Sequence, residues 1–262
     1  MQTPLHILAI FGVLALTWLT ACNAQIGAGS ASSNPLLVAA AASVEPAFTE
    51  LGAAYTAQTG NAVDFVFGSS GNLATQIENG APFDVFASAD EGFVDRLADN
   101  DLVLHDTVAV YANGRLVLAV NRESGITLDS IADLADVSVQ RVAIANPELA
   151  PYGAAAREAL QQAGIWQEVE SKIVQGANVR QALQYVQTGD AAAGLVALSI
   201  VDVPEVRYTL VNEDLYTPLQ QAMAIVAATD QERDAREFTD FVLGPVGQSI
   251  LAKHGFAAPG AL

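Results

Sequence analysis

The sequence predicts an α/β protein with two lobes, each a mixed, mostly parallel sheet flanked by helices. From residue 36 onward, short apolar runs of strand length alternate with segments whose apolar residues recur at helical spacing. Repeated strand–helix units of this length imply parallel strands with helices on the faces of the sheet. The 262 residues, of which 52% are hydrophobic, are enough for one large or two medium cores.

The first lobe is expected to begin with three strand–helix units. Its strands are the apolar runs 36–42, 62–67 and 83–87. A helix follows the first strand, because apolar residues recur on one helical face up to Tyr55, and Gly60 ends this helix. A second helix follows the GSSG sequence. A third is expected after Ser88, which has Glu91 at the spacing of a capping box.

The chain is expected to cross into the second lobe near residue 112. Two strands, at 108–111 and 115–121, flank an Asn-Gly turn at Asn113 and Gly114. Strands and helices then alternate again. The expected strands are 141–145, 172–174 and 193–201, and the expected helices are 128–134, 154–164 and 179–186.

A strand at 222–228 is expected to return the chain to the first lobe. The C-terminal segment after it is helical, with a break at Gly244-Pro245. We therefore assign residues 36–112 and 222–262 to the first lobe and residues 113–221 to the second.

The N-terminus has the pattern of a targeting segment. Residues 8–20 are almost wholly apolar, which is the length of a signal-peptide core and too short for a membrane span. The LTAC sequence that ends at Cys22 resembles the processing box of bacterial lipoproteins, whose cysteine is lipidated and becomes the mature N-terminus. We therefore expect residues 1–21 to be a lipoprotein signal peptide and residues 22–35 a flexible, lipid-anchored tether.

A second interpretation of this segment is a plain signal peptide, cut near Ala21 or Ala24, in which Cys22 has no role. Both interpretations export the protein; the first tethers it to the membrane on the periplasmic or cell-surface side. Cys22 is the single cysteine of the chain, so an internal disulfide is excluded.

The charge balance restricts the possible partners. Acidic residues outnumber basic ones by 29 to 11, and the formal net charge is −18. Such a field repels nucleic acids and anionic lipid surfaces, so we expect neither as a partner. The histidines His6, His105 and His254 are far apart in the sequence, so no site with direct cation ligands is expected.

Four strand-to-helix corners carry residues suited to binding an anion. Ligands of open parallel sheets bind beyond the carboxyl ends of the strands, where helix N-termini present free N–H groups and a partial positive charge. The candidates are Ser43, Ser69 to Gly71, Pro151 to Gly153, and Asn178 with Val179. Each corner has the simpler interpretation of a helix cap, and residue types alone do not name a ligand.

Five segments occur in an order typical of one family. They are AAASVEPAF, FGSSGNLATQIENGAPFDVFASAD, NPELAPYGAAAREAL, NVRQALQYVQTGDAAAGLVALS and the C-terminal FVLGPVGQSILAKHGF. Together they resemble the periplasmic molybdate-binding proteins of ABC transporters, over residues 35–257. The most specific segment is the serine-rich corner followed by IENGAPFDVFASAD.

The resemblance implies a periplasmic-binding-protein fold of type II that closes over a tetrahedral oxyanion in the cleft between its lobes. The ligand donors that it implies are hydroxyl and N–H groups of Ser43 and Ser70 and the backbone N–H groups of Tyr152 and Val179. Ser69, Gly71, Asn178 and Arg180 are further candidates, either to contact the anion or to support these donors. Molybdenum is then held only as the oxyanion, and no cofactor is expected.

One position departs from the family pattern. The commoner form adds a tyrosine hydroxyl from the strand that matches GLVALS, and here this position is Ala197. Some members carry a tyrosine in the PYG loop instead. We hypothesise that Tyr152 supplies the missing hydroxyl as well as its N–H.

Neutral donors suit molybdate and tungstate, because these dianions only accept hydrogen bonds. Hydrogen phosphate keeps a proton that needs an acceptor, and a buried unpaired donor costs about 1–3 kcal/mol. The nearest carboxylate is Glu45, which is expected to point outward near its helix N-terminus. Arg180 is expected to face solvent. Sulfate is also a bare dianion, so only cavity size and closure geometry reject it.

We therefore expect a monomeric, membrane-tethered binding protein that delivers molybdate or tungstate to the permease of an ABC importer through hinge closure, without catalysis. Another oxyanion, such as sulfate or phosphate, is one alternative. A sensory oxyanion-binding protein is another. An exported hydrolase with Ser43 or Ser70 as nucleophile is a third, for which the sequence offers no suitable base.

Overall fold

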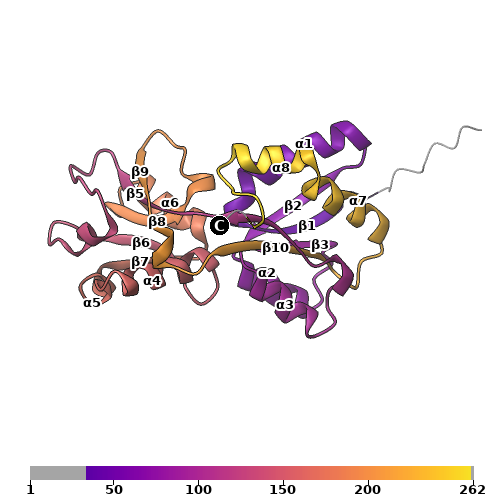
Figure 1. Cartoon of the computed structure of the whole chain (residues 1–262), viewed down its shortest axis with the longest axis horizontal. Helices are drawn as coiled ribbons and strands as arrows, with labels where there is room; N and C mark the ends of the chain where they lie inside the picture. Colours follow the sequence, from indigo (N-terminus) through magenta and orange to yellow (C-terminus); the bar gives the residue numbers. More distant parts are fainter. Residues whose placement is uncertain (1–33, 261–262) are drawn as a thin grey trace, which may run out of the picture. The chain divides into compact units, whose positions relative to one another are not determined.

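Two five-stranded sheets form the framework of the computed structural model, which describes residues 34–260 (Figure 1). The strands of the first sheet are β1 (Leu36–Ala41), β2 (Val63–Gly68), β3 (Val85–Ala87), β4 (Ala109–Gly114) and β10 (Leu219–Ile225), in the order β2-β1-β3-β10-β4. β1 is parallel to β2 and β3, whereas β10 is antiparallel to β3 and β4. We call the part built on this sheet lobe 1.

The second sheet repeats this arrangement. Its strands are β5 (Leu116–Asn121), β6 (Val142–Ala145), β7 (Ile173–Gly176), β8 (Ala193–Ala197) and β9 (Val206–Leu210), in the order β7-β6-β8-β5-β9. β6 is parallel to β7 and β8, and β5 is antiparallel to β8 and β9. The part built on it is lobe 2. The prediction of two α/β lobes with mixed sheets is confirmed.

Helices cover both faces of the first sheet. α1 (Glu45–Thr59), α7 (Glu232–Leu243) and α8 (Pro245–Lys253) lie over one face, and α2 (Ser70–Glu78) and α3 (Glu91–Ala98) over the other (Figure 1). Side chains of β1 alternate between the two cores: Val38 and Ala40 lie under α1, whereas Ala39 lies under α2. β1 is apolar throughout because both of its faces are buried.

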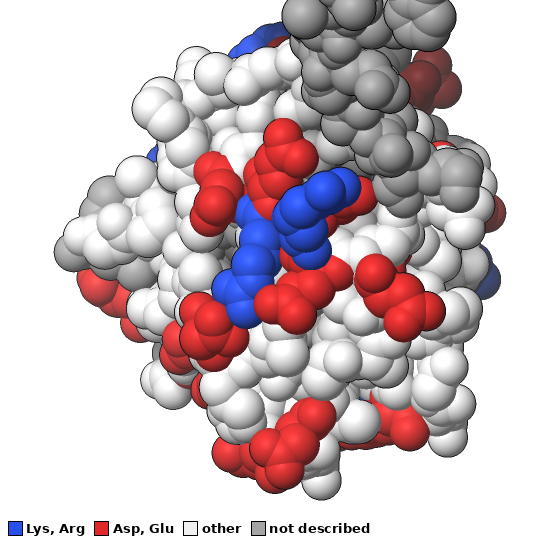
Figure 2. Space-filling model, turned by 90° about the vertical axis from the view of Figure 1, so that its right-hand side faces the viewer, with Lys and Arg blue, Asp and Glu red and all other residues white. Residues whose placement is uncertain are grey.

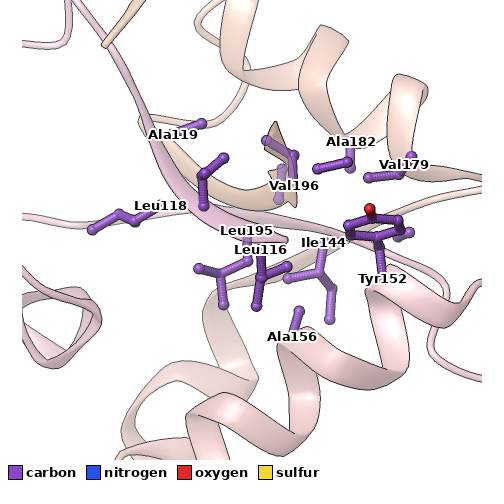
Figure 3. Close-up of a cluster of buried hydrophobic side chains, with 14 of the residues drawn as sticks. Leu116, Leu118, Ala119, Ile144, Tyr152, Ala156, Val179, Ala182, Leu195 and Val196 are labelled. Atoms are coloured by element: carbon purple, nitrogen blue, oxygen red, sulfur yellow. The ribbon is translucent and has the colours of Figure 1, made fainter. Parts of the chain in front are cut away.

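Helices also flank the second sheet. They are α4 (Pro151–Gln162), α5 (Trp166–Val169) and α6 (Val179–Gln187). In the core of lobe 2, Ala156 of α4 faces Ile144, and Ala182 of α6 lies beside Val196 (Figure 3). α4 thereby packs against β6, which precedes it, and α6 packs against β8, which follows it.

The expected Asn-Gly turn is wrong. Asn113 and Gly114 are the last residues of β4, and β5 begins in the other sheet after one intervening residue. Asn113 exchanges two backbone hydrogen bonds with Ala257 near the C-terminus. Alternating apolar residues on both sides of an Asn-Gly pair fit a hairpin and a crossing between two sheets equally well. The predicted lobe limits at 112 and 222 fall inside β4 and β10, and as domain boundaries they stay a prediction.

Three local details also differ from expectation. The N-cap of α3 is Asp90, whose Oδ1 accepts from the N–H of Gly92 at 2.8 Å, so the capping box of Ser88 and Glu91 is wrong. The strand predicted at 193–201 ends at Ala197 and is followed by a short 3-10 helix, η5 (Leu198–Ile200). β9 lies where no strand was expected.

The N-terminal predictions lie outside the described residues. These are the signal peptide, the lipidation of Cys22 and all but the last two residues of the tether. Among the helices of the described part, none is long and apolar enough to cross a membrane.

Candidate functional site

A small cavity lies between the lobes, beyond the carboxyl ends of parallel strands from both sheets. Six of the eight candidate residues line it: Ser43, Ser69, Ser70, Tyr152, Asn178 and Val179. Its volume is about 10 Å³, which is about the space of one water molecule. The corners after β1, β2, β6 and β7 therefore converge, as expected for open parallel sheets.

Three buried serine hydroxyls from lobe 1 lie at this cavity. The Oγ atoms of Ser43 and Ser69 have no hydrogen-bond partner among the described residues. The Ser70 Oγ accepts from the N–H of Ala89 at 3.0 Å, and its own proton is not used by this contact. Buried polar groups are usually paired, so two unpaired hydroxyls at one cavity indicate a place where an acceptor binds.

The starts of α4 and α6 contribute backbone N–H groups from lobe 2. Pro151 begins α4 and has no N–H, so the N–H of Tyr152 is the first one of that helix. Asn178 caps α6, and its Oδ1 accepts from the N–H groups of Arg180 and Gln181 at 3.0 and 3.1 Å. The cap leaves the N–H of Val179, the first residue of α6, without an intrahelical acceptor.

The Tyr152 side chain is fully buried and points from α4 into the interior of the molecule (Figure 3). Its hydroxyl accepts from Nε2 of Gln221 at 3.4 Å. Burial raises the pKa of this hydroxyl well above its ordinary value, and Ser199 lies within hydrogen-bond reach of it.

Three contacts join the lobes around the cavity. The N–H of Gly71 donates to the carbonyl of Leu149 at 2.9 Å. Ser199 Oγ, on η5, donates to the carbonyl of Ser43 at 2.7 Å. Arg180 Nε lies 2.9 Å from Glu45 Oε2. The cavity therefore lies within a closed arrangement of the two lobes.

Two candidates do not line the cavity. Gly71 contacts Leu149, and a Cβ on Gly71 would lie 2.9 Å from the Leu149 carbonyl oxygen, so a glycine permits this close approach. Arg180 and Glu45 are partly exposed and line a larger neighbouring groove of about 770 Å³. The expectation that both charged side chains point away from the ligand corner agrees with their position.

The cavity is lined by neutral residues only. It therefore presents hydroxyl and N–H groups and no carboxylate, a donor set that suits an anion without a proton. Within the described part of the chain, no group of three or more His, Cys, Asp or Glu side chains is arranged to hold a metal ion.

Sequence reasoning missed three residues at this site. Ser199 bonds the Ser43 carbonyl, Ala89 holds the Ser70 hydroxyl, and Gln221 contacts Tyr152. Ser199 lies in the 3-10 helix that follows β8, and Ala89 precedes the N-cap of α3, so both stand at strand-to-helix corners that were not singled out. Gln221 lies within β10 and carries no such signal.

Comparison with known proteins agrees with this arrangement. The family of bacterial extracellular solute-binding proteins matches residues 36–257. The chain is 34% identical to the molybdate-binding protein ModA of Rhodobacter capsulatus over 227 residues, which cover 86% of this chain and 89% of that protein. It is 31% identical to YvgL of Bacillus subtilis, named as an ABC transporter substrate-binding lipoprotein, with coverage of 95% and 96%.

Comparison with a solved structure also identifies a molybdate-binding protein as similar to this chain. The periplasmic molybdate-binding protein of Azotobacter vinelandii superposes with a TM-score of 0.80 at 31% identity, covering 86% of this chain and 99% of that one. The agreement extends over both lobes.

Proposed function

Because this chain belongs to the bacterial extracellular solute-binding proteins, and among them to the ModA family, we propose that it captures molybdate or tungstate outside the cytoplasm. It is a binding protein and not an enzyme. It delivers the anion to the permease of an ABC importer, which takes up the solute that such a protein presents.

One observation carries the proposal: four helix starts from two lobes meet at a single cavity that holds two unpaired serine hydroxyls and no charged side chain. A dianion with four acceptor oxygens satisfies such donors. The positive ends of the helices favour the negative charge without a buried cation.

We assign the anion to hydroxyl groups of Ser43 and Ser70 and to N–H groups of Tyr152 and Val179. Ser69 is added as a direct donor, because its hydroxyl is buried at the cavity without a partner. The Tyr152 hydroxyl replaces the donor that is missing at Ala197. In support, Gly114 packs against this hydroxyl, and β5, which starts two residues later, pairs Leu116 with Ala197.

Entry requires the lobes to separate, because contacts between them surround the cavity and leave less room than a tetrahedral anion needs. The anion then bridges donors of both lobes and stabilises the closed form. Delivery from this form to a permease, by a monomer tethered through a lipid on Cys22, completes the proposal. The lipoprotein name of the related YvgL supports the tether.

A ligand panel tests the assignment. The exported form, starting after the signal peptide, is heated with molybdate, tungstate, sulfate or phosphate, and its unfolding is followed. A ligand at about 1,000 times its Kd adds about 4 kcal/mol to the free energy of unfolding. We expect a clear rise in Tm with molybdate or tungstate and none with phosphate.

Sulfate is the control that decides between oxyanions, since it also lacks a proton. A shift with sulfate or phosphate, and none with molybdate or tungstate, would contradict the assignment and make the protein a carrier of the other anion. Calorimetric titration of the same four anions measures their Kd values and orders the preference.

A further inference from the structure

Gln221 is a fully buried polar residue in β10, one of the two strands through which the chain passes between the lobes. The pairing of β10 with β4 is irregular at this point: Gln221 is opposite Ala112, but Ala222 is opposite Val110. Tyr111 is thus the extra residue of a β-bulge, a feature that redirects side chains. Both side chains are buried.

The amide of Gln221 contacts a tyrosine on each side. The single Tyr111 hydroxyl proton is shared between the carbonyl oxygen of Ser88, at 3.1 Å, and Gln221 Oε1, at 3.4 Å. Gln221 Nε2 donates to the Tyr152 hydroxyl at 3.4 Å. The amide therefore links lobe 1 to the tyrosine at the start of α4 in lobe 2.

Gly114 leaves the space that this contact needs. A Cβ at Gly114 would lie 2.2 Å from the Tyr152 hydroxyl oxygen and 2.5 Å from Gln221 Nε2. Any larger residue there would push these two groups aside. The glycine and the bulge together place the amide against the tyrosine hydroxyl.

A tyrosine hydroxyl has one proton to donate. While its oxygen accepts the N–H of Gln221, this proton is directed away from the amide, toward the side where Ser199 also contacts the hydroxyl. A bound oxyanion competes with Ser199 for this proton. We propose that Gln221 is a positioning residue for anion binding, which orients the Tyr152 hydroxyl so that it donates to the bound oxyanion. This inference rests on the proposed function.

The same network reaches the serine corner of lobe 1. Ser88, whose carbonyl accepts from Tyr111, precedes Ala89, whose N–H holds the Ser70 hydroxyl. A change at Gln221 therefore acts mainly on Tyr152, since Tyr111 keeps its bond to Ser88.

A double-mutant cycle on the exported form tests the inference, with molybdate as the titrant. Gln221→Met removes both amide bonds at nearly constant volume, and Tyr152→Phe removes the hydroxyl. We expect each single change to weaken binding about tenfold. The double variant is expected to bind within about twofold of Tyr152→Phe alone, because Gln221 acts through the hydroxyl.

Gln220→Met is the matched control, because Gln220 lies next to Gln221 on the opposite face of β10 and is not fully buried. We expect its Kd to stay within about twofold of the parent's. If Gln221→Met does not fold, Gln221→Asn is used instead. Its side chain is one methylene shorter, so its amide no longer reaches Tyr152, and we expect the same loss of molybdate affinity.

The inference is overturned if the Gln221 variant binds molybdate with the Kd of the parent. It is also overturned if the fold-increases in Kd of the two single variants multiply in the double variant, as they do for independent sites. A parent protein that binds neither molybdate nor tungstate refutes the proposed function instead. The titration of the parent comes first and separates these outcomes.

Discussion

At the residue scale, the three cavity serines differ in what their hydroxyls do before a ligand binds. Ser43 and Ser69 each bury an unpaired hydroxyl, whereas the Ser70 oxygen accepts the N–H of Ala89. We expect Ser43→Ala and Ser69→Ala to leave the ligand-free stability unchanged or higher, because each removes an unsatisfied group. Ser70→Ala is expected to cost about 1–3 kcal/mol, because it leaves a buried N–H unpaired.

Chemical unfolding measures these three stabilities, and calorimetry measures molybdate affinity, which we expect to fall about tenfold or more for each variant. Ser130→Ala, which alters an exposed helix cap far from the cavity, is the control and keeps the parent affinity. A drop in the stability of Ser43→Ala equal to that of Ser70→Ala would contradict the division of roles.

The candidate residues that sequence reasoning found share one property: they stand where a helix begins after a strand. Ser43, Ser70, Tyr152 and Val179 are all of this kind, and the cavity brings them together. Ser199 also follows a strand, in the short helix after β8, but it bonds to Ser43, which lies 156 residues away in the other lobe. Its role depends on how one lobe meets the other, and no local pattern contains that information.

At the element scale, the approach of α2 to the loop before α4 depends on Gly71. A Cβ at this position would lie 2.9 Å from the Leu149 oxygen and 3.2 Å from the Phe93 ring. We expect Gly71→Ala to hold the lobes slightly apart and to weaken molybdate binding about tenfold, the usual effect of overpacking by 1–3 kcal/mol. The stability of the separate lobes is expected to change little.

Small-angle scattering with and without molybdate follows closure, and calorimetry follows affinity. Asn72→Ala, an exposed change on the next residue of α2, serves as the control. The prediction is contradicted if Gly71→Ala binds molybdate as tightly as the parent and shows the same change in scattering on adding molybdate. The contact of Gly71 with Leu149 would then not be part of closure.

Most elements were predictable because their apolar residues repeat at helical spacing or form continuous buried runs. α1 ends at Gly60, which has a φ of 81°, as the glycine signal indicated. β4 and β5 were placed correctly but joined by the wrong connection, since the sequence around Asn113 does not tell which sheet a strand enters. β9 has only one fully buried residue, Val206, and so lacks the apolar pattern of the other strands.

At the scale of the whole molecule, the acidic charge and the neutral cavity have separate effects. The net charge of −18 is spread over the surface, and the end of lobe 1 shows one small group of basic side chains bordered by acidic ones (Figure 2). Glu45 lies near the cavity in the adjoining groove, where it pairs with Arg180. The surface field thus opposes the approach of a dianion, while the helix starts bind it after arrival.

This separation predicts an unusual salt dependence of binding. The screening length is about 30 Å at 0.01 M salt and about 8 Å at 0.15 M, so added salt weakens the repulsion of the incoming dianion. We expect the association rate of molybdate to rise roughly two- to tenfold over this range. Stopped-flow fluorescence, in chloride salts of one cation, measures the rate.

Glu45→Gln removes one of the repelling charges, so its association rate with molybdate at low salt is expected to exceed the parent's. A rate that falls with salt would mean that local basic groups such as Arg180 steer the anion, and that the surface field has little influence.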